Sequence, residues 1–102
     1  MGWHRVLAFD DLPEDRPVLR EAGGVPVLLV RVGWDVVATH GLCPHKFTPL
    51  DEGQVQDGQV ACALHGATFD LHTGEPAPGC EWAGRLRVLS ARVRDGHVEV
   101  EV

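Results

Sequence analysis

Two short pairs of cysteine and histidine stand out in the sequence, Cys43-Pro44-His45 and Cys62-Ala63-Leu64-His65. Thiolates and imidazoles are strong ligands for zinc and iron, so both pairs are candidate metal ligands. Sixteen residues separate the pairs, and Asp57-Gly58 lies between them. Because Asp-Gly is a strong signal for a hairpin turn, we expect the two pairs to lie side by side and to share one site.

Two kinds of centre fit this donor set. Structural zinc usually takes its ligands as a Cys pair and a His pair, each closely spaced. Here each pair mixes one Cys with one His. Mixed pairs on two loops are typical of a Rieske centre, in which two His replace two Cys on one iron of a [2Fe-2S] cluster.

The elements that must position these loops are β-strands. Short β-branched runs between Gly, Pro and Asp predict strands over residues 18–20, 25–32 and 36–39. Asp57-Gly58 predicts a hairpin of residues 54–56 with 59–62, and Asp95-Gly96 one of residues 86–94 with 97–102. In the last strand Val98, Val100 and Val102 alternate with Glu99 and Glu101, which predicts one buried and one solvated face.

No segment sustains a helical period, and residues 10–15 could form one helical turn at most. Turn signals recur about every 8–12 residues, which predicts an all-β domain of roughly eight to ten short strands. Two loops, residues 41–53 and 72–84, are too long for tight hairpins, and residues 63–67 are irregular directly after a strand. Long loops in compact domains often carry function, and two of these three carry the Cys/His pairs.

Composition limits the class of protein. The 102 residues fit a single domain over residues 1–102, and the net charge of −6 argues against a nucleic-acid partner. Three cysteines without a secretory signal make a disulfide framework improbable. No apolar run is long enough to span a bilayer, so we expect a cytoplasmic protein with no membrane association.

The order of the motifs resembles that of the Rieske family over nearly the whole chain. After the first pair come Gly53, the second pair with Gly66, then Phe69-Asp70-Leu71, Thr73-Gly74, Pro76-Ala77-Pro78 and the hairpin at Asp95-Gly96. The resemblance implies a Rieske-like fold of three antiparallel sheets, with the cluster held by two loops at one tip. It also implies that Cys43 and Cys62 bind the buried iron, and that His45 and His65 bind the outer iron.

The chain differs from the high-potential members that it resembles. Those members carry an extra Cys in each cluster loop, paired as a disulfide, whereas residues 45–48 and 63–64 contain none. They also place hydroxyls of Ser and Tyr against cluster or ligand sulfur, where this chain has Ala67 and Phe69. Since hydrogen bonds to sulfur stabilise the electron-rich reduced state, their loss predicts a low-potential ferredoxin.

The surroundings of the pairs are mostly apolar, with Lys46, Asp51 and Glu52 as the nearest charges. We expect a docking tip around the imidazoles, formed by Pro44, Phe47, Pro49, Leu50, Leu64, Pro76 and Pro78. Outside this tip we expect Cys80 to be a buried or half-buried thiol and His40 to be a solvent-facing residue at a strand end. We expect the tryptophans, Trp3, Trp34 and Trp82, to pack on the sheets.

The resemblance implies an electron carrier and not an enzyme. Like the soluble ferredoxins of bacterial aromatic-ring dioxygenases, it would be a monomer that passes single electrons from a flavin-dependent reductase to a terminal oxygenase. One alternative is a Rieske-like small subunit of a nitrite reductase or of another multicomponent redox enzyme. A second alternative is a zinc-stabilised binding module without a redox role, which would be colourless where an iron–sulfur protein is red-brown.

The absent hydroxyls and the absent disulfide lead to a prediction for the reduction potential. We expect a midpoint of about −100 mV or below, in the lower part of the Rieske range of about −150 to +300 mV. Protein-film voltammetry of the purified protein measures it directly. A midpoint above about +100 mV would contradict the low-potential assignment.

Overall fold

The computed structural model describes residues 2–14, 16–64 and 66–102. In these residues the chain forms ten strands, three 3₁₀ turns and no α-helix. The strands are β1 (Trp3–Ala8), β2 (Val18–Ala22), β3 (Val25–Val32), β4 (Asp35–His40), β5 (Gln54–Gln56), β6 (Gln59–Ala61), β7 (Thr68–Asp70), β8 (Val88–Leu89), β9 (Ala91–Arg94) and β10 (His97–Glu101). The turns are η1 (Phe9–Asp11), η2 (Leu50–Glu52) and η3 (Glu81–Ala83). The predicted all-β class is confirmed, and none of the described turns is long and apolar enough to cross a membrane.

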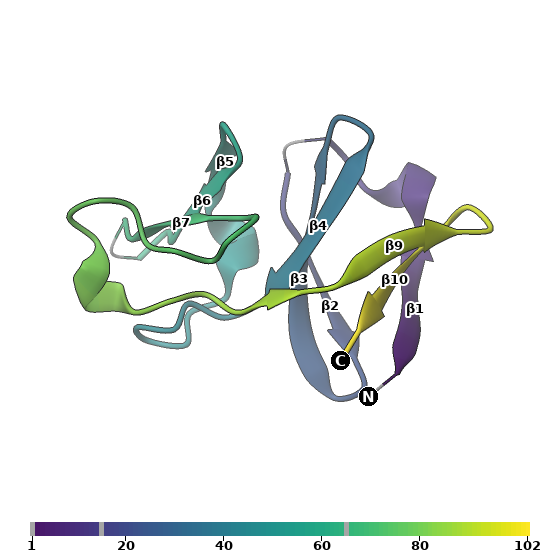
Figure 1. The fold of residues 1–102 in the computed structure, drawn as a ribbon, viewed down its shortest axis with the longest axis horizontal. Coiled ribbons are helices and arrows are strands. Elements are labelled where there is room, and N and C mark those ends of the chain that lie inside the picture. Colours follow the sequence, from purple (N-terminus) through teal and green to yellow (C-terminus); the bar gives the residue numbers. More distant parts are fainter. Residues whose placement is uncertain (1, 15, 65) are drawn as a thin grey trace.

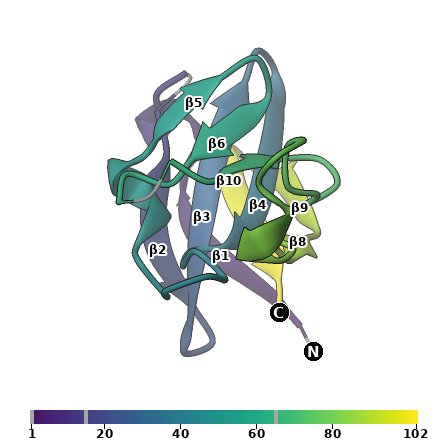
Figure 2. The same ribbon diagram turned by 90° about the vertical axis from the view of Figure 1, so that its left-hand side faces the viewer.

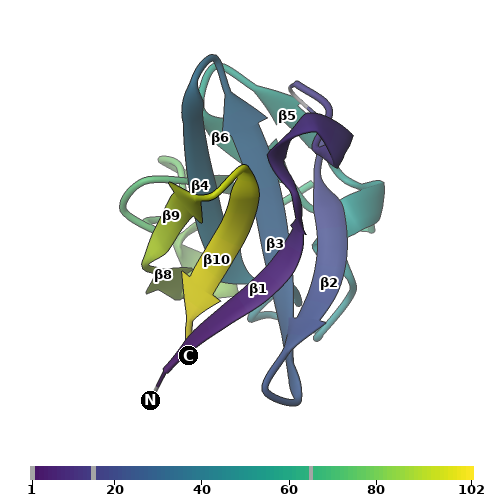
Figure 3. The ribbon, with the colours of Figure 1, turned by 90° about the vertical axis from the view of Figure 1, so that its right-hand side faces the viewer.

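Three antiparallel sheets lie in a row along the long axis of the molecule (Figure 1). The sheet β2-β3-β4-β8 stands in the middle, with β1-β10-β9 on one side and β5-β6-β7 on the other. Both chain ends lie on the β1-β10-β9 side, away from the loops that carry the Cys/His pairs (Figures 1 and 3). There the N–H groups of Gly2 and Val102 each donate to the other's carbonyl, at 3.0 and 3.1 Å.

Strand β3 separates two hydrophobic cores. Its residues Leu28 and Val30 belong to the core that contains Cys43 and Cys62. Val27 and Leu29 belong to the other core, which is built with β1 and β10. Because successive side chains of a strand point to opposite faces, a strand between two layers needs an unbroken apolar run, and residues 25–30 supply it.

The predicted strand over residues 86–94 is wrong in its extent. The structure divides it into β8, which pairs with β4 in the middle sheet, and β9, which pairs with β10 in the terminal sheet. The exposed Ser90 lies between them, because a chain that crosses from one sheet to the next must change its pairing partner. The helical turn predicted within residues 10–15 is the shorter η1, and Asp15 lies outside the described residues.

No strand is predicted from the sequence at β1 or β7. The register of β1 is irregular between Arg5 and Leu7, which interrupts its alternation of side chains. Strand β7 has only three residues, fewer than the roughly four to eight over which alternation identifies a strand.

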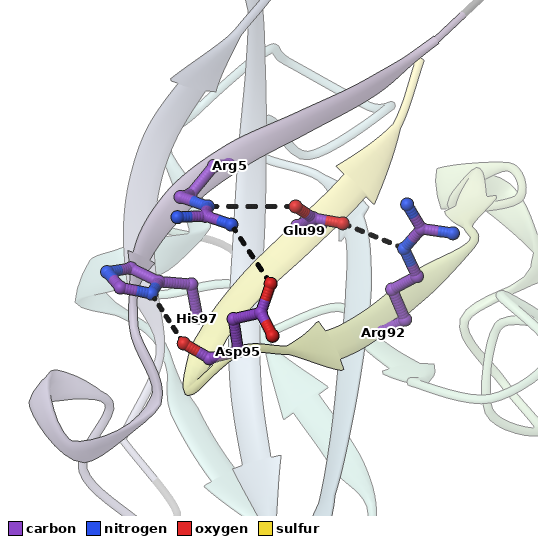
Figure 4. A network of polar contacts seen from close by, with 5 residues as sticks. All are labelled: Arg5, Arg92, Asp95, His97 and Glu99. Atoms are coloured by element: carbon purple, nitrogen blue, oxygen red, sulfur yellow. Dashed lines mark hydrogen bonds and ion pairs between the residues drawn. The ribbon is translucent and has the colours of Figure 1, made fainter.

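Glu99 overturns the predicted solvated face of the last strand. Val98 and Val100 are buried as predicted, but Glu99 is only 8% exposed. Its carboxylate accepts a hydrogen bond from Arg92 Nε at 2.8 Å and lies 3.7 Å from Arg5 Nε (Figure 4). The two arginines come from the strands on either side of β10, so the ion pairs join all three strands of this sheet and make burial of the charge tolerable.

We expect Glu99→Gln to lower the melting temperature at pH 7 by a few degrees, and the deficit to shrink in acid. The hydrogen bond from Arg92, with the charges of Arg92, Arg5 and Arg94, holds the pKa of Glu99 below its ordinary 4.5. A carboxylate with a lowered folded pKa stabilises the fold above the unfolded pKa, and this contribution is lost as the pH falls through the folded value.

Thermal melts of the cluster-loaded protein at pH 7 and below pH 4.5 measure both effects. Glu101→Gln, on the same strand but without a recorded ion pair in the described residues, is the matched control. A deficit that stays the same at both pH values would show that packing, and not charge, is responsible.

Candidate metal centre

The two loops that carry the Cys/His pairs lie toward the β5-β6-β7 end of the molecule (Figure 2), and their described residues share a pattern of backbone hydrogen bonds. In the first loop, residues 42–49, the Cys43 N–H donates to Thr48 O at 2.7 Å and the Cys43 carbonyl accepts from Phe47 N–H at 2.7 Å. In the second loop, residues 61–68, the Cys62 N–H donates to Ala67 O at 2.7 Å and the Cys62 carbonyl accepts from Gly66 N–H at 2.9 Å. The bonds have the same spacing, so each cysteine takes the same place in its loop.

A strand-like bridge closes each loop, Leu42 with Pro49 and Ala61 with Thr68. The residue four after each cysteine has a left-handed backbone, with φ 56° at Phe47 and 72° at Gly66. Glycine adopts this conformation without strain, whereas a side chain costs about 1–2 kcal/mol there. The first loop therefore carries backbone strain at Phe47 that the second loop avoids.

The cysteines lie in the same core. Cys43 and Cys62 are both buried there, close enough for one thiol to affect the ionisation of the other. Burial raises the pKa of the Cys43 thiol and the nearby Cys62 raises it further, while the backbone N–H groups of His45 and Lys46 act against the rise. Two neighbouring buried thiols, with backbone amides near one sulfur, fit a metal or cluster that binds them as thiolates and releases their protons.

The histidines are described only in part. His45 is half-buried, and its ring meets the indole ring of Trp82 edge-on, with the ring centroids 4.8 Å apart. His65 lies outside the described residues. Without it, the described side chains contain no group of three or more His, Cys, Asp or Glu that could hold a metal ion. The set of four ligands therefore stays a prediction. The structure shows only that two of them, Cys43 and Cys62, are buried in the same core.

The apolar tip largely agrees with the predicted one. Phe47 is 73% and Leu64 62% exposed, one on each loop. Leu50 is the exception: it is fully buried in the core beneath the cysteines, and its N–H donates to Gly41 O at 2.9 Å. It opens the turn η2, so its side chain anchors the first loop and is absent from the surface.

The expectation that the tryptophans pack on the sheets is wrong for Trp34 and Trp82. Trp34 is 85% exposed in the turn between β3 and β4. Trp3, on β1, packs under the Arg92 guanidinium of β9 in the same sheet, 3.9 Å from its ring centroid. Trp82 is 53% exposed beside His45, a placement that the sequence analysis missed. Its position in the long loop of residues 72–84 was the available signal, because loops of that length often carry function.

Two further residues lie near the first loop or the long loop. Cys80 is half-buried, as predicted. His40 lies at the end of β4, as predicted, and is half-buried. It lines a cavity of about 330 Å³ with Pro44, Phe47 and Arg87 among its neighbours. Burial, with a smaller effect of the Arg87 charge, lowers the pKa of His40.

Residues 2–83 match the family described as the Rieske [2Fe-2S] domain. The chain belongs to this family. Its cofactor is therefore a Rieske-type [2Fe-2S] cluster, which decides against the zinc alternative. The predicted fold of three antiparallel sheets with two cluster loops is that of this family and is confirmed.

Several relatives of this Rieske chain are named as ferredoxins of dioxygenase systems. The anthranilate 1,2-dioxygenase ferredoxin subunit of Burkholderia cepacia is 43% identical, over 98% of this chain and 92% of its own length. Among solved structures, the ferredoxin of carbazole 1,9a-dioxygenase from Nocardioides aromaticivorans IC177 has a TM-score of 0.90 at 28% identity, covering 98% of this chain and 97% of that one. A chain from a complex of reduced oxygenase and oxidized ferredoxin in carbazole 1,9a-dioxygenase has a TM-score of 0.86 at 30% identity, covering 96% and 91%.

Gly53 holds the two loops at their spacing, and we expect Gly53→Ala to damage the site. A Cβ at this position would collide with the Ala61 carbonyl oxygen, directly before Cys62. Separating the loops to relieve the collision should cost about 1–3 kcal/mol of stability and lower the cluster content. Iron per chain, visible absorbance and the melting temperature measure these losses.

Gly2→Ala is the matched control, because nothing lies within 4 Å of a Cβ added there. If Gly53→Ala loaded and melted as Gly2→Ala does, the close approach of Gly53 to Ala61 would not position the loops.

Proposed function

We propose that this protein is a Rieske ferredoxin that accepts single electrons from a flavin-dependent reductase and passes them to a terminal oxygenase. The observation that carries the proposal is a buried pair of thiols directly beneath an exposed apolar tip. The family supplies the cluster for these thiols, and the relative with 43% identity is named as the ferredoxin subunit of a dioxygenase.

In this proposal Cys43 and Cys62 hold the inner iron, while His45 and His65 hold the outer iron. The cluster, when bound, supplies one-electron oxidation and reduction. The chain's own contribution is to bury the thiolates, to aim the N–H groups of His45 and Lys46 at the Cys43 sulfur, and to leave one edge near the surface. A buried inner side and an accessible outer side direct electron exchange to the tip.

The structure also supports the low potential proposed for the cluster. Ala67 and Phe69 occupy the places where high-potential members carry hydroxyls, and both are fully buried in the core with the cysteines. Water therefore cannot take over the missing hydrogen bonds from that side. With fewer donors to sulfur, the reduced state is less stabilised.

Electron exchange needs only a small and transient interface. Phe47 and Leu64 supply exposed apolar surface on the two loops, one on each side of the site. The net charge of −6 would steer the chain toward a basic surface on its partner. We therefore place the docking surface at the tip formed by these two residues.

Residues 1–102 form, in our proposal, a single domain that acts as a monomer in the cytoplasm. None of the three cysteines forms a disulfide, as is usual in a reducing compartment. A small subunit of a nitrite reductase would have the same fold and would differ in its partner. The name of the Burkholderia relative favours an oxygenase.

Electron transfer through the tip is tested by replacing Phe47. We expect Phe47→Asp to slow electron transfer roughly tenfold or more, because a charge in the centre of a small apolar interface costs affinity, while the cluster spectrum stays unchanged. The purified protein is mixed with the reductase and oxygenase of the Burkholderia anthranilate 1,2-dioxygenase system, and the reduction and reoxidation of its visible band are followed.

Phe47→Gly is a second variant, for the case that Phe47→Asp does not fold. Glycine adopts the left-handed backbone at this position without strain, and the substitution removes the same apolar surface. Trp34→Asp adds a charge at an exposed aromatic residue outside the cluster loops and should transfer at the wild-type rate. Wild-type transfer by both Phe47 variants would exclude the tip as the docking surface. Failure of the wild-type protein to speed reduction of the oxygenase would exclude the oxygenase role.

A further inference from the structure

Trp82 lies in direct contact with a proposed cluster ligand but comes from neither cluster loop. Its indole ring meets the His45 imidazole with centroids 4.8 Å apart and 84° between the ring planes. Edge-to-face pairs of this kind are attractive and depend on ring orientation. With 53% of its surface exposed, the indole also separates part of the His45 ring from solvent.

The indole is fixed from its own side. Its Nε1–H donates to Gly79 O at 3.0 Å, and the Gly79 N–H donates to both carboxylate oxygens of Glu81, at 2.8 and 2.9 Å. These bonds close the turn that carries Trp82. They hold the indole ring in its place before any contact with His45 is made.

The turn η3 is also anchored to the rest of the site. Ala83, next to Trp82, is buried in the core that contains Cys43 and Cys62. Gly84 follows with φ 85°, and a Cβ there would lie 3.9 Å from the Pro44 Cβ, so this turn packs against the first loop. An aromatic ring held by the core, by its own turn and by the first loop is preorganised for the ring that it contacts.

We infer that Trp82 is a positioning residue for the cluster, which orients the His45 ring and limits its hydration. The inference rests on the proposed function, because it requires His45 to be a ligand. Water around a ligand favours the more highly charged state of the centre, and the apolar groups around it thereby set its potential. A cluster with two thiolates and two neutral imidazoles is near neutral when oxidised and gains a negative charge on reduction. Trp82 thus keeps the potential low by excluding water from the outer iron's ligand.

The test compares Trp82→Ala, Trp82→Phe and Trp34→Ala. In Trp82→Ala the midpoint potential should shift upward and the EPR g values of the reduced cluster should change, because His45 gains water and rotational freedom. Trp82→Phe keeps an aromatic edge beside His45 and should restore most of both properties. Trp34→Ala removes an exposed Trp side chain outside the site, and should leave the potential and g values as in the wild type.

An unchanged potential and unchanged g values in Trp82→Ala would overturn the inference. If Trp82→Ala failed to load the cluster, Trp82→Leu would replace it, and wild-type values in that loaded variant would overturn the inference equally. His45→Ala separates this failure from failure of the proposed site. If His45→Ala loses the Rieske EPR signal while Trp82→Ala leaves the potential and g values unchanged, only the positioning role of Trp82 is rejected. If His45→Ala keeps the signal, His45 is rejected as a ligand.

Discussion

Burial of two neighbouring thiols is the constraint on which the rest of the site depends. Cys43 and Cys62 lie on separate loops, yet both side chains are buried in one core. Burial raises the pKa of the Cys43 thiol, so its thiolate forms only where a cation compensates the charge. The repeated loop geometry, the close approach of Gly53 to Ala61 and the buried Leu50 all act to hold these two sulfurs together.

The division of the molecule by β3 separates stability from function. One core, built with β1 and β10, lies on the side away from the cluster loops and is closed by strand pairing of the chain ends. The other core contains the cysteines. Because the terminal sheet has a core and an ion-pair network of its own around Glu99, the loops at the other end can expose apolar side chains and carry strain without support from that region.

At the surface of the site, two aromatic residues depart from the usual preferences for backbone conformation and burial. Phe47 has a left-handed backbone that the equivalent Gly66 accepts without strain, and it is largely exposed. Trp82 is a large aromatic residue left half in solvent beside a proposed ligand. Departures of this kind concentrate at functional sites, which is the physical reason to assign docking to Phe47 and ligand positioning to Trp82.

The sequence by itself determined the chemistry, the all-β class and the hairpins, because ligand types, strand periodicity and Asp-Gly turns are local properties. Only the tertiary structure decided which residues face solvent. Leu50 is buried although its neighbours in the chain are exposed. Glu99 is buried because the two adjacent strands place arginines beside it. Residues 86–94 form two strands because one part pairs with β4 and the other part pairs with β10. Trp82 reaches His45 from a distant loop. Each of these outcomes depends on contacts between segments far apart in the chain, which residue type and spacing do not encode.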